Sequence, residues 1–320
     1  MSELIHIGGD SPTELAETRC IVHELRLVLP PGLAALDGLH PCFSSTAAGH
    51  QRAARLHLPV SPACNIECRF CARKFNAHEQ RPGVARGLIR PEDTPDIVAR
   101  ALQLVPSLKV IGIAGPGETL ATNHALRAFA AVHQRFPHLL LCLSTNGLML
   151  KDRAEELAAN GVGTITVTVN AVDAGIAAAI VGSISLHGKR VHGIAAGALL
   201  AERQLAGISR ACSLGLVVKI NTVLIPGLND GHIAAIAAAT ASFGALRINI
   251  IPLLPQHELA HYAEPNAAQL AEARKSAARH LDVFTHCHRC RADAFGVPGG
   301  EDFSGQLYGA SPVEATFSHG

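Results

Sequence analysis

Six short apolar runs alternate with longer helical stretches along most of the chain. Each run is rich in β-branched or aliphatic residues, and such runs are typical of strands buried on both faces of a parallel sheet. The predicted strands are 56–60, 109–114, 139–144, 164–170, 216–225 and 245–253. The stretches between them carry charges spaced along one face, which predicts helices at 94–104, 125–136, 151–159, 194–214 and 232–243. Gly161, Gly215 and Gly244 each follow a predicted helix, where a left-handed cap favours glycine.

The repeated strand–helix unit predicts an α/β fold. Six such units without a dinucleotide-binding glycine fingerprint favour a partial (β/α)6 TIM-like barrel, although the pattern alone leaves a doubly wound sheet open. In both architectures the functional site lies at the carboxyl ends of the strands. We predict three parts, namely an irregular N-terminal extension over 1–50, the barrel over 51–260, and a C-terminal helix with an irregular tail over 261–320.

Composition narrows the classes of function. The chain has 320 residues and a formal net charge of +1, which gives no electrostatic footprint for nucleic acid or for an acidic membrane surface. Its longest uncharged stretches fall short of the roughly 18 residues that a membrane-spanning helix needs. The acidic N-terminus does not resemble a secretory signal, so we expect a cytoplasmic protein. In that reducing compartment, nine cysteines indicate metal or catalytic chemistry rather than disulfides.

Three of these cysteines form the strongest motif in the chain. Cys64, Cys68 and Cys71 follow the first predicted strand, on a predicted loop, with the spacing C-x3-C-x2-C. Three thiolates so close in sequence can bind three irons of one iron-sulfur cluster and leave the fourth iron open to a small molecule. Zinc is the alternative, but zinc sites usually take four protein ligands or cysteine pairs that lie far apart in the sequence.

In this place the triplet resembles the radical S-adenosylmethionine (SAM) superfamily. The resemblance implies a 4Fe-4S cluster whose open iron binds SAM, a barrel of the radical SAM type, and a 5′-deoxyadenosyl radical formed when the reduced cluster splits SAM. It also implies that Phe70 lies near the adenine and that the glycine-rich segment after the second strand holds the SAM amino group. The further SAM contacts implied by position are Gly115, Gly117, Glu118, Thr168, Asn170, Asn221 and Thr222. Polar groups that only cap strand ends are the alternative reading for the asparagines and Thr222.

Further segments, in one order along the chain, are similar to the NifB family of nitrogenase cofactor-maturation proteins. They are 40–42, 81–84, 112–117, 141–148, 190–193, 225–230 and 287–293. The resemblance implies that the chain binds two more 4Fe-4S clusters and fuses them, with insertion of a carbide and a sulfide, into the eight-iron precursor of the nitrogenase cofactor. It implies as partners an iron-sulfur cluster donor, a reductant such as ferredoxin or flavodoxin, and a cofactor carrier or scaffold protein.

The same resemblance supplies candidate ligands for the additional clusters. They are His40, Cys42, Cys142, Cys287 and Cys290, with Cys142 placed near the carboxyl end of its predicted strand. For Cys142 a small buried side chain is the alternative reading. Cys20 and Cys212 match no motif.

The chain also departs from the family pattern. The loop 74–80 lacks the cysteine usual there, although His78 offers an imidazole, and Ala171 stands where the family has another cysteine. The remaining ligands fit two weakly held clusters, or one auxiliary cluster in a radical SAM enzyme that acts on an organic or peptide substrate. A third possibility, an iron-sulfur carrier without SAM chemistry, is disfavoured by Gly117 and Glu118. No carrier domain follows in the sequence, so we expect the product to leave on a separate protein.

Overall fold

The computed structural model describes residues 31–309 and the backbone of 318–319. The first thirty residues of the predicted N-terminal extension, including Cys20, therefore lie outside the described residues. Eight strands form the main sheet, in the order β13-β12-β11-β8-β7-β6-β1-β14. Its parallel central strands are β1 (Ala54–His57), β6 (Leu108–Ile113), β7 (Leu140–Thr145), β8 (Val162–Thr168), β11 (Val217–Leu224) and β12 (Arg247–Pro252).

The strand order confirms the α/β fold with a partial barrel. Each central strand lies beside the next one in the chain, and the order never reverses as it would in a doubly wound sheet. Two short strands that the sequence did not reveal extend the edges. The strand β13 (Asp282–Phe284) is parallel to β12, and β14 (Phe295–Gly296) is antiparallel to β1.

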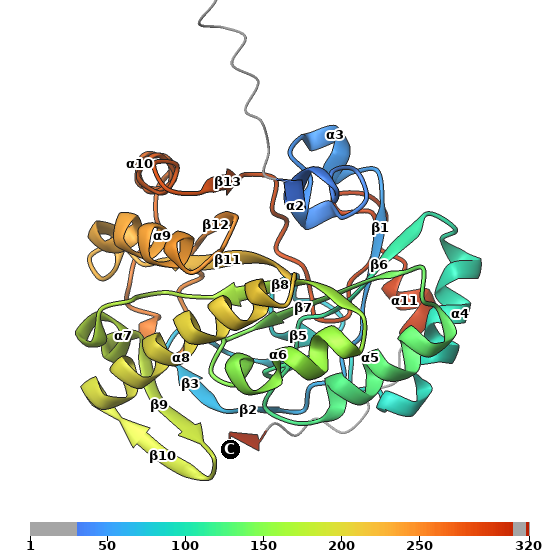
Figure 1. The fold of residues 1–320 in the computed structure, drawn as a ribbon, viewed down its shortest axis with the longest axis horizontal. Helices are drawn as coiled ribbons and strands as arrows, with labels where there is room; N and C mark the ends of the chain where they lie inside the picture. Colours follow the sequence, from blue (N-terminus) through green and yellow to red (C-terminus); the bar gives the residue numbers. More distant parts are fainter. Residues whose placement is uncertain (1–30, 310–317, 320) are drawn as a thin grey trace, which may run out of the picture.

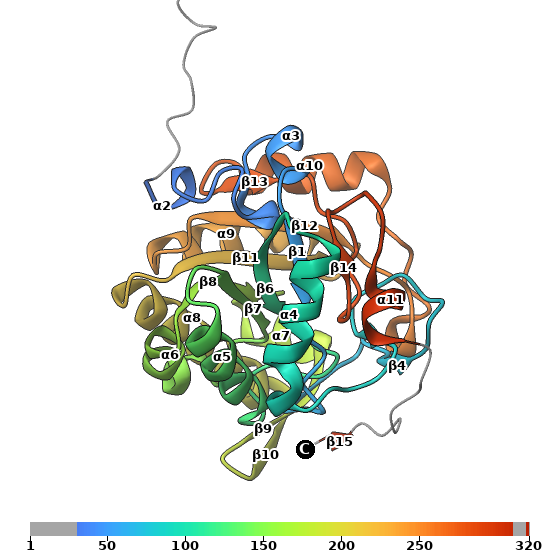
Figure 2. The same ribbon diagram turned by 90° about the vertical axis from the view of Figure 1, so that its right-hand side faces the viewer.

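Helices cover the outer face of the curved sheet (Figures 1 and 2). They are α4 (Thr94–Leu104), α5 (His124–Arg135), α6 (Leu150–Ala159), α8 (Gly193–Ser213), α9 (Ile233–Ser242) and α10 (Ala267–Ala277). A shorter helix, α7 (Ala174–Ile180), packs against α8. All five predicted barrel helices are confirmed to within one residue at each end. Gly161, Gly215 and Gly244 have φ of 77°, 81° and 102°, which confirms the predicted left-handed caps.

The sequence did not predict the helix α7 or the hairpin that follows it, both of which come after β8. The helix α7 is followed by an antiparallel hairpin of β9 (Val181–Leu186) and β10 (Lys189–His192). The strand β9 also pairs with β3 (Ile66–Cys68), so the hairpin belongs to a small separate sheet. Its apolar residues alternate with serine and glycine, a pattern too short to distinguish from a loop.

The first strand begins and ends earlier than its apolar run predicts. The ladder of β1 with β6 covers Ala54–His57 instead of 56–60. Pro59 has no N–H to donate, so the run 56–60 cannot continue a central ladder to its end. Within β1, Leu56 lies in the core beneath the helices, while Arg55 and His57 project to the opposite, inner face of the sheet.

The N-terminal extension closes the amino end of the barrel. It contains α2 (Pro31–Ala34), a 3₁₀ turn η1 (Pro41–Phe43) and α3 (Ala47–His50), and it lies at the end opposite the β9–β10 hairpin (Figures 1 and 2). Its buried side chains pack against residues at the beginnings of strands. The contacting residues are Leu33, Leu36, Phe43, Leu140, Val217 and Leu246.

The tail after β13 contains little helix or strand, yet it packs against the barrel along a defined path. Residues 285–294 lead from β13 at one edge of the sheet to β1, next to the other edge, where the His57 N–H donates to the Ala294 carbonyl at 2.9 Å. A short helix, α11 (Ser304–Tyr308), then packs against α4. The tail thereby covers the opening between the two edges of the partial barrel. No helix within the described ranges is long and apolar enough to span a membrane.

A buried ion pair anchors this tail. The Arg291 guanidinium donates to both carboxylate oxygens of Asp293, at 2.8 and 3.1 Å, and to the carbonyls of Asn76 and Glu79. Arg86 donates to the same carboxylate through its backbone N–H at 2.7 Å. Arg291 and Asp293 are 1% and 0% exposed, so neither charge is stabilised by water.

We predict that Asp293→Ala lowers the free energy of unfolding by about 3–5 kcal/mol, because it leaves the buried Arg291 charge uncompensated. Asp96→Asn, which breaks an exposed pair with Arg135, is the control and costs less than about 1 kcal/mol. Urea unfolding of both variants provides the measurement. Equal losses in the two variants would contradict the buried pair's role.

Candidate functional site

The cysteine triplet lies at the carboxyl end of β1. Cys64 belongs to β2 (Ala63–Cys64), Cys68 ends β3, and the Cys71 N–H donates to the Cys68 carbonyl at 3.0 Å. Cys64 is buried, whereas Cys68 and Cys71 are half-buried. The short strands replace the loop that we expected here and fix the backbone on either side of Asn65.

Burial desolvates two of the three thiols, those of Cys64 and Cys68. Burial raises the pKa of Cys64 to about 11, with smaller raising contributions from Glu118 and Cys71. Burial, followed by the charges of Cys71 and Cys64, raises the pKa of Cys68 well above its usual range. The Arg73 guanidinium lowers both pKa values, so it lies close enough to stabilise the thiolates. A metal centre would supply the positive charge needed to deprotonate all three thiols.

Within the described ranges, no group of three or more His, Cys, Asp or Glu side chains is arranged around a single metal ion. An iron-sulfur cube is ligated iron by iron, so its thiolates need not converge on one point. The spacing of the triplet is therefore compatible with a cluster.

The glycine-rich segment after β6 holds the backbone of the triplet. The Gly117 N–H donates to the Ser61 carbonyl at 2.8 Å, and the Glu118 N–H donates to the Ala63 carbonyl at 2.7 Å. A Cβ at Gly117 would lie 2.2 Å from the Ala63 carbonyl oxygen, so this position accepts only glycine. Gly115 has φ of 121°, a conformation that also favours glycine.

Glu118 joins three segments of the site through its buried carboxylate. It accepts hydrogen bonds from the Leu120 N–H at 3.0 Å, from the Asn146 N–H at 2.7 Å and from the Thr145 hydroxyl. Burial raises the pKa of Glu118, while these three hydrogen bonds and Arg73 lower it. Three donors leave room for one more at a carboxylate, as an ammonium ligand would require.

An asparagine pair extends this network to the triplet. The Asn146 side-chain amide donates to the Asn65 side-chain oxygen at 2.7 Å. The Asn65 side-chain nitrogen is buried and has no hydrogen-bond partner within the described residues. Buried amide groups are nearly always paired, so an unpaired one beside Cys64 fits a site that takes a ligand. Asn65, Thr145 and Asn146 were not among the site residues predicted from the sequence.

The remaining predicted SAM contacts differ in their surroundings. Asn170 accepts from the Val223 N–H at 2.9 Å, and Asn221 accepts from the Asn249 amide at 3.2 Å. Thr222 is fully buried on the face of β11 that packs beneath the helices, and its hydroxyl donates to the Val169 carbonyl at 2.7 Å. Thr222 thus serves the sheet in this structure rather than an open site.

Phe70 and Thr168 are both half-buried. The Phe70 ring packs in the apolar cluster that also contacts Cys68. The Thr168 carbonyl accepts from the Gln204 side chain at 2.9 Å, and the same amide donates to the Asn146 carbonyl at 2.7 Å. The helix α8 thereby fixes the ends of β7 and β8 relative to each other.

A second group of thiols gathers deeper in the barrel. Leu33, Leu36 and Phe43 of the N-terminal extension form an apolar plug at the amino end of the barrel. Cys42 and Cys142 pack against this plug. Burial raises the pKa of Cys142 to about 12, and the neighbouring Cys42 adds to the shift. Cys142 is the third of six residues in β7, opposite Gly112 and Thr164. The expectation that it lies near the carboxyl end of its strand is therefore wrong, since the strand continues through Thr145.

The tail brings Cys287 to this second group. Its thiol is exposed, yet the protein around it desolvates the thiolate and raises the pKa to about 11, with Cys42 and Cys290 adding to the shift. Lys219 on β11 opposes the shifts at both Cys142 and Cys287, so its ammonium lies near both thiols.

His40 lies beside the same lysine. Burial, followed by the Lys219 charge, lowers the pKa of His40 to about 3, so the imidazole is neutral. Its Nδ1 accepts from the Cys42 N–H at 3.2 Å, and its Nε2 is buried with no partner in the described part of the chain. A neutral buried imidazole is a suitable metal ligand. Binding through Nε2 would move the ring proton to Nδ1 and release the Cys42 N–H.

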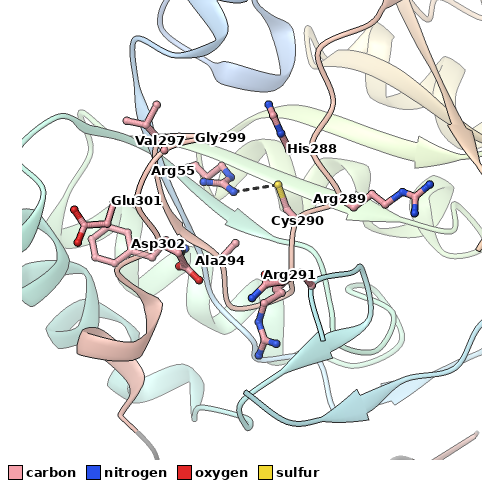
Figure 3. A pocket seen from close by; sticks show the side chains of 13 residues that line it. Arg55, His288, Arg289, Cys290, Arg291, Ala294, Val297, Gly299, Glu301 and Asp302 are labelled. Atoms are coloured by element: carbon pink, nitrogen blue, oxygen red, sulfur yellow. Dashed lines mark hydrogen bonds between the residues drawn. The ribbon is translucent and has the colours of Figure 1, made fainter. Parts of the chain in front are cut away.

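Cys290 lines a small cavity between the tail and β1. The cavity has a volume of about 130 Å³, and the Arg55 guanidinium donates to the Cys290 sulfur across it at 3.1 Å (Figure 3). His288 and Arg289 contribute side chains from the same stretch of tail. His78, the other candidate ligand, is exposed on the 74–80 loop, and Ala171 is buried in an apolar cluster.

Lys219 and Arg55 are the inner residues that sequence reasoning missed. Each is a single charged residue in or beside a predicted apolar strand. Lys219 lies between Val218 and Ile220, and Arg55 directly precedes Leu56. A long charged side chain on the inner face of a buried parallel strand is anomalous. That anomaly was the available signal.

Comparison with known proteins agrees with this geometry. A family model described as "Radical SAM superfamily" matches residues 58–239. A protein of Methanocaldococcus jannaschii, named FeMo cofactor biosynthesis protein NifB, is 40% identical over 267 residues, which cover 82% of this chain and 88% of that protein. The chain belongs to the NifB family of the radical SAM superfamily. A NifB of Klebsiella pneumoniae is 45% identical over 287 residues, which cover 87% of this chain but only 61% of the relative's length.

Solved structures agree on the fold of this NifB-family chain. SuiB of Streptococcus suis gives a TM-score of 0.50 at 14% identity, covering 86% of this chain and 60% of that chain. At this identity the likeness concerns the fold alone. It supports the partial barrel that the strand order shows.

We predict that Gly117→Ala displaces the triplet backbone, because its Cβ would collide with the Ala63 carbonyl. After anaerobic reconstitution, the variant should bind about four fewer irons per chain, the content of one cluster. Gly163→Ala on β8 is the matched control, since its Cβ meets nothing within 4 Å. Full iron binding by the Gly117 variant would show that the close approach does not hold the triplet.

Proposed function

We propose that this chain is a radical SAM enzyme of nitrogenase cofactor biosynthesis, which fuses two 4Fe-4S clusters with carbide and sulfide insertion into an eight-iron precursor. The observation that carries the proposal is the presence of two separate groups of thiols in one barrel. Cys64, Cys68 and Cys71 lie at the carboxyl end, while Cys42 and Cys142 lie deeper, beside the apolar plug. A radical SAM enzyme that holds only the SAM-binding cluster has no need for the second group. The curated relatives' shared name supports the same reading.

At the first group, the chain would bind a cluster and orient SAM. The triplet thiolates would hold a 4Fe-4S cluster that, with SAM, supplies a 5′-deoxyadenosyl radical. Arg73 stabilises the thiolate charge. Glu118 offers its remaining acceptor position to an ammonium group, and the unpaired amide nitrogen of Asn65 offers a donor to a carboxylate. Phe70, Gly115, Asn170 and Asn221 complete the nucleotide side of this proposal.

At the second group, the chain holds the substrate clusters. The proposed ligands are His40, Cys42, Cys142, Cys287 and Cys290. Thiolates and imidazole suit iron-sulfur clusters, and incomplete ligation lets a finished cluster leave. Because residues 285–294 cover the opening of the barrel, Cys287 and Cys290 would close round a substrate that enters there.

A second candidate function follows from the ligand count. His78 is exposed and Ala171 carries no donor, so neither replaces the cysteines usual in the family. Five ligands also suit one auxiliary cluster in an enzyme that acts on an organic or peptide substrate. The two functions differ in iron content, which is about twelve per chain for three clusters and about eight for two.

The proposed reaction also defines its partners. It consumes assembled clusters, electrons and SAM, so we propose an iron-sulfur cluster donor, a reductant such as ferredoxin or flavodoxin, and a carrier protein for the product. Such partners, and the cytoplasmic location expected from the sequence, suit oxygen-sensitive cluster chemistry.

We predict that Cys64→Ala abolishes formation of 5′-deoxyadenosine from SAM and dithionite, because the first cluster loses one of its three ligands. Cys212→Ala, which removes a half-buried thiol on α8 outside both groups, retains it. Chromatographic assay of the nucleoside under anaerobic conditions is the measurement. Unchanged product from the Cys64 variant would exclude radical SAM chemistry at the triplet.

We further predict that Cys42→Ala and Cys287→Ala still form 5′-deoxyadenosine but no longer yield an eight-iron species that activates cofactor-free nitrogenase. These variants remove ligands of the second group only. They should therefore affect the activation of nitrogenase without affecting the formation of 5′-deoxyadenosine. If both variants activated nitrogenase as well as the wild-type chain does, the ligand assignment would be wrong. If the wild-type chain bound about eight irons and gave no activation, the alternative function would replace the proposal.

A further inference from the structure

Two buried cations face the second thiol group. Lys219 is 3% exposed and Arg55 is 8% exposed. Within residues 31–309, neither of them forms an ion pair with a carboxylate. An unpaired charge inside a protein is costly, so such residues normally have a counter-charge.

Other buried cations of the same chain follow that rule. The Arg247 guanidinium is 1% exposed and pairs with Asp282 at 2.5 Å. Arg291, equally buried, pairs with Asp293 at 2.8 Å. Lys219 and Arg55 are therefore exceptions within their own fold, and both of them lie next to cysteines.

The surroundings of Lys219 stabilise its charge without neutralising it. Its Nζ lies 5.3 Å from the centroid of the Phe43 ring, 5.2 Å from that of Phe284, and 3.4 Å from the Cys42 carbonyl oxygen. Ring faces and one carbonyl offer partial negative charge only. Cys142 and Cys287, whose thiol pKa values Lys219 lowers, are neighbouring groups that can carry a full negative charge.

Arg55 is placed in the same way toward Cys290. One of its terminal nitrogens donates to the Gly296 carbonyl at 2.6 Å, and the other donates to the Cys290 sulfur at 3.1 Å (Figure 3). Its Nε is buried and has no hydrogen-bond partner among the described residues. The guanidinium thus fixes Cys290 and retains one donor.

We propose that Lys219 and Arg55 supply the positive charge that balances an anionic cluster held by the second thiol group, and that Lys219 raises the reduction potential of that cluster. The inference rests on the proposed function, because it concerns the cluster assigned there. Each thiolate adds one negative charge to a cluster, and a cluster becomes more negative still when it is reduced. A fixed neighbouring cation favours both binding and reduction, since net charge is one of the factors that set cluster potentials.

The test isolates the second group. The full chain carrying Cys64→Ala, Cys68→Ala and Cys71→Ala loses its first cluster, so that all bound iron reports on the second group. In this background Lys219→Met removes the charge and keeps an unbranched side chain, and Lys219→Arg restores the charge. Lys109→Met, at an exposed position on β6, is the matched control for loss of a lysine.

Iron content and the midpoint potential of the cluster, followed by electron paramagnetic resonance, are the readouts. We expect Lys219→Met to shift the midpoint to more negative values and to lower iron content, while Lys219→Arg restores both and Lys109→Met changes neither. Arg55→Met should lower iron content as well, which provides a second variant. In the metal-free chain, Lys219→Met should not lower the melting temperature, because it removes an unpaired buried charge.

Three results would overturn the inference. An unchanged midpoint and iron content in both Lys219→Met and Arg55→Met, with clusters present, would refute the charge role alone and leave the proposed function standing. A lower melting temperature in the metal-free Lys219→Met chain, with an unchanged midpoint, would assign Lys219 to fold stability. Absence of any cluster from the triplet-free background chain would overturn the second site and the inference together.

Discussion

The close backbone contact between the glycine-rich segment and the cysteine triplet is the constraint on which the first site depends. Two hydrogen bonds, from Gly117 to Ser61 and from Glu118 to Ala63, join the carboxyl end of β6 to the strand that carries Cys64. The Glu118 carboxylate then reaches β7 through Thr145 and Asn146. The thiols, the carboxylate and the amide are consequently held just beyond the carboxyl ends of β1, β6 and β7, three successive strands of the main sheet. A site for radical chemistry needs such fixed geometry, because reacting atoms must stay aligned.

The second site obeys a different constraint, which is charge. The barrel interior contains thiols, a neutral imidazole and two cations without carboxylate partners in the described ranges. The protein alone gives the two cations no counter-charge within the described ranges, whereas an anionic cluster ligated by the thiols would supply one. The tail completes this arrangement, because it carries Cys287 and Cys290 from β13 to β1 and is anchored there by Arg291 and Asp293. The same segment thus covers the opening of the barrel and carries two of the proposed cluster ligands.

Much of the fold could be predicted because its signals are local. The five predicted barrel helices match to within one residue, since apolar periodicity and glycine caps act over one or two turns. The strands were found with less exact ends. Pro59 shortens β1, and Cys142 lies in the middle of β7 because the strand extends through Thr145. The hairpin of β9 and β10 and the short strands β13 and β14 escaped notice, because each depends on a partner strand distant in sequence.

The sequence by itself determined the α/β class, the triplet and its chemistry, and the resemblance to a family that the comparisons confirm. These properties depend on residue types and on their spacing, and both can be read directly from the sequence. Only the tertiary structure decided that Gly117 is needed by the backbone of Ser61 and Ala63, and that Thr222 faces the helices. It also decided that Lys219 and Arg55 lie beside thiols from both ends of the chain, without a carboxylate partner among residues 31–309. Those facts depend on which distant segments meet, and that is set by the curvature and closure of the sheet.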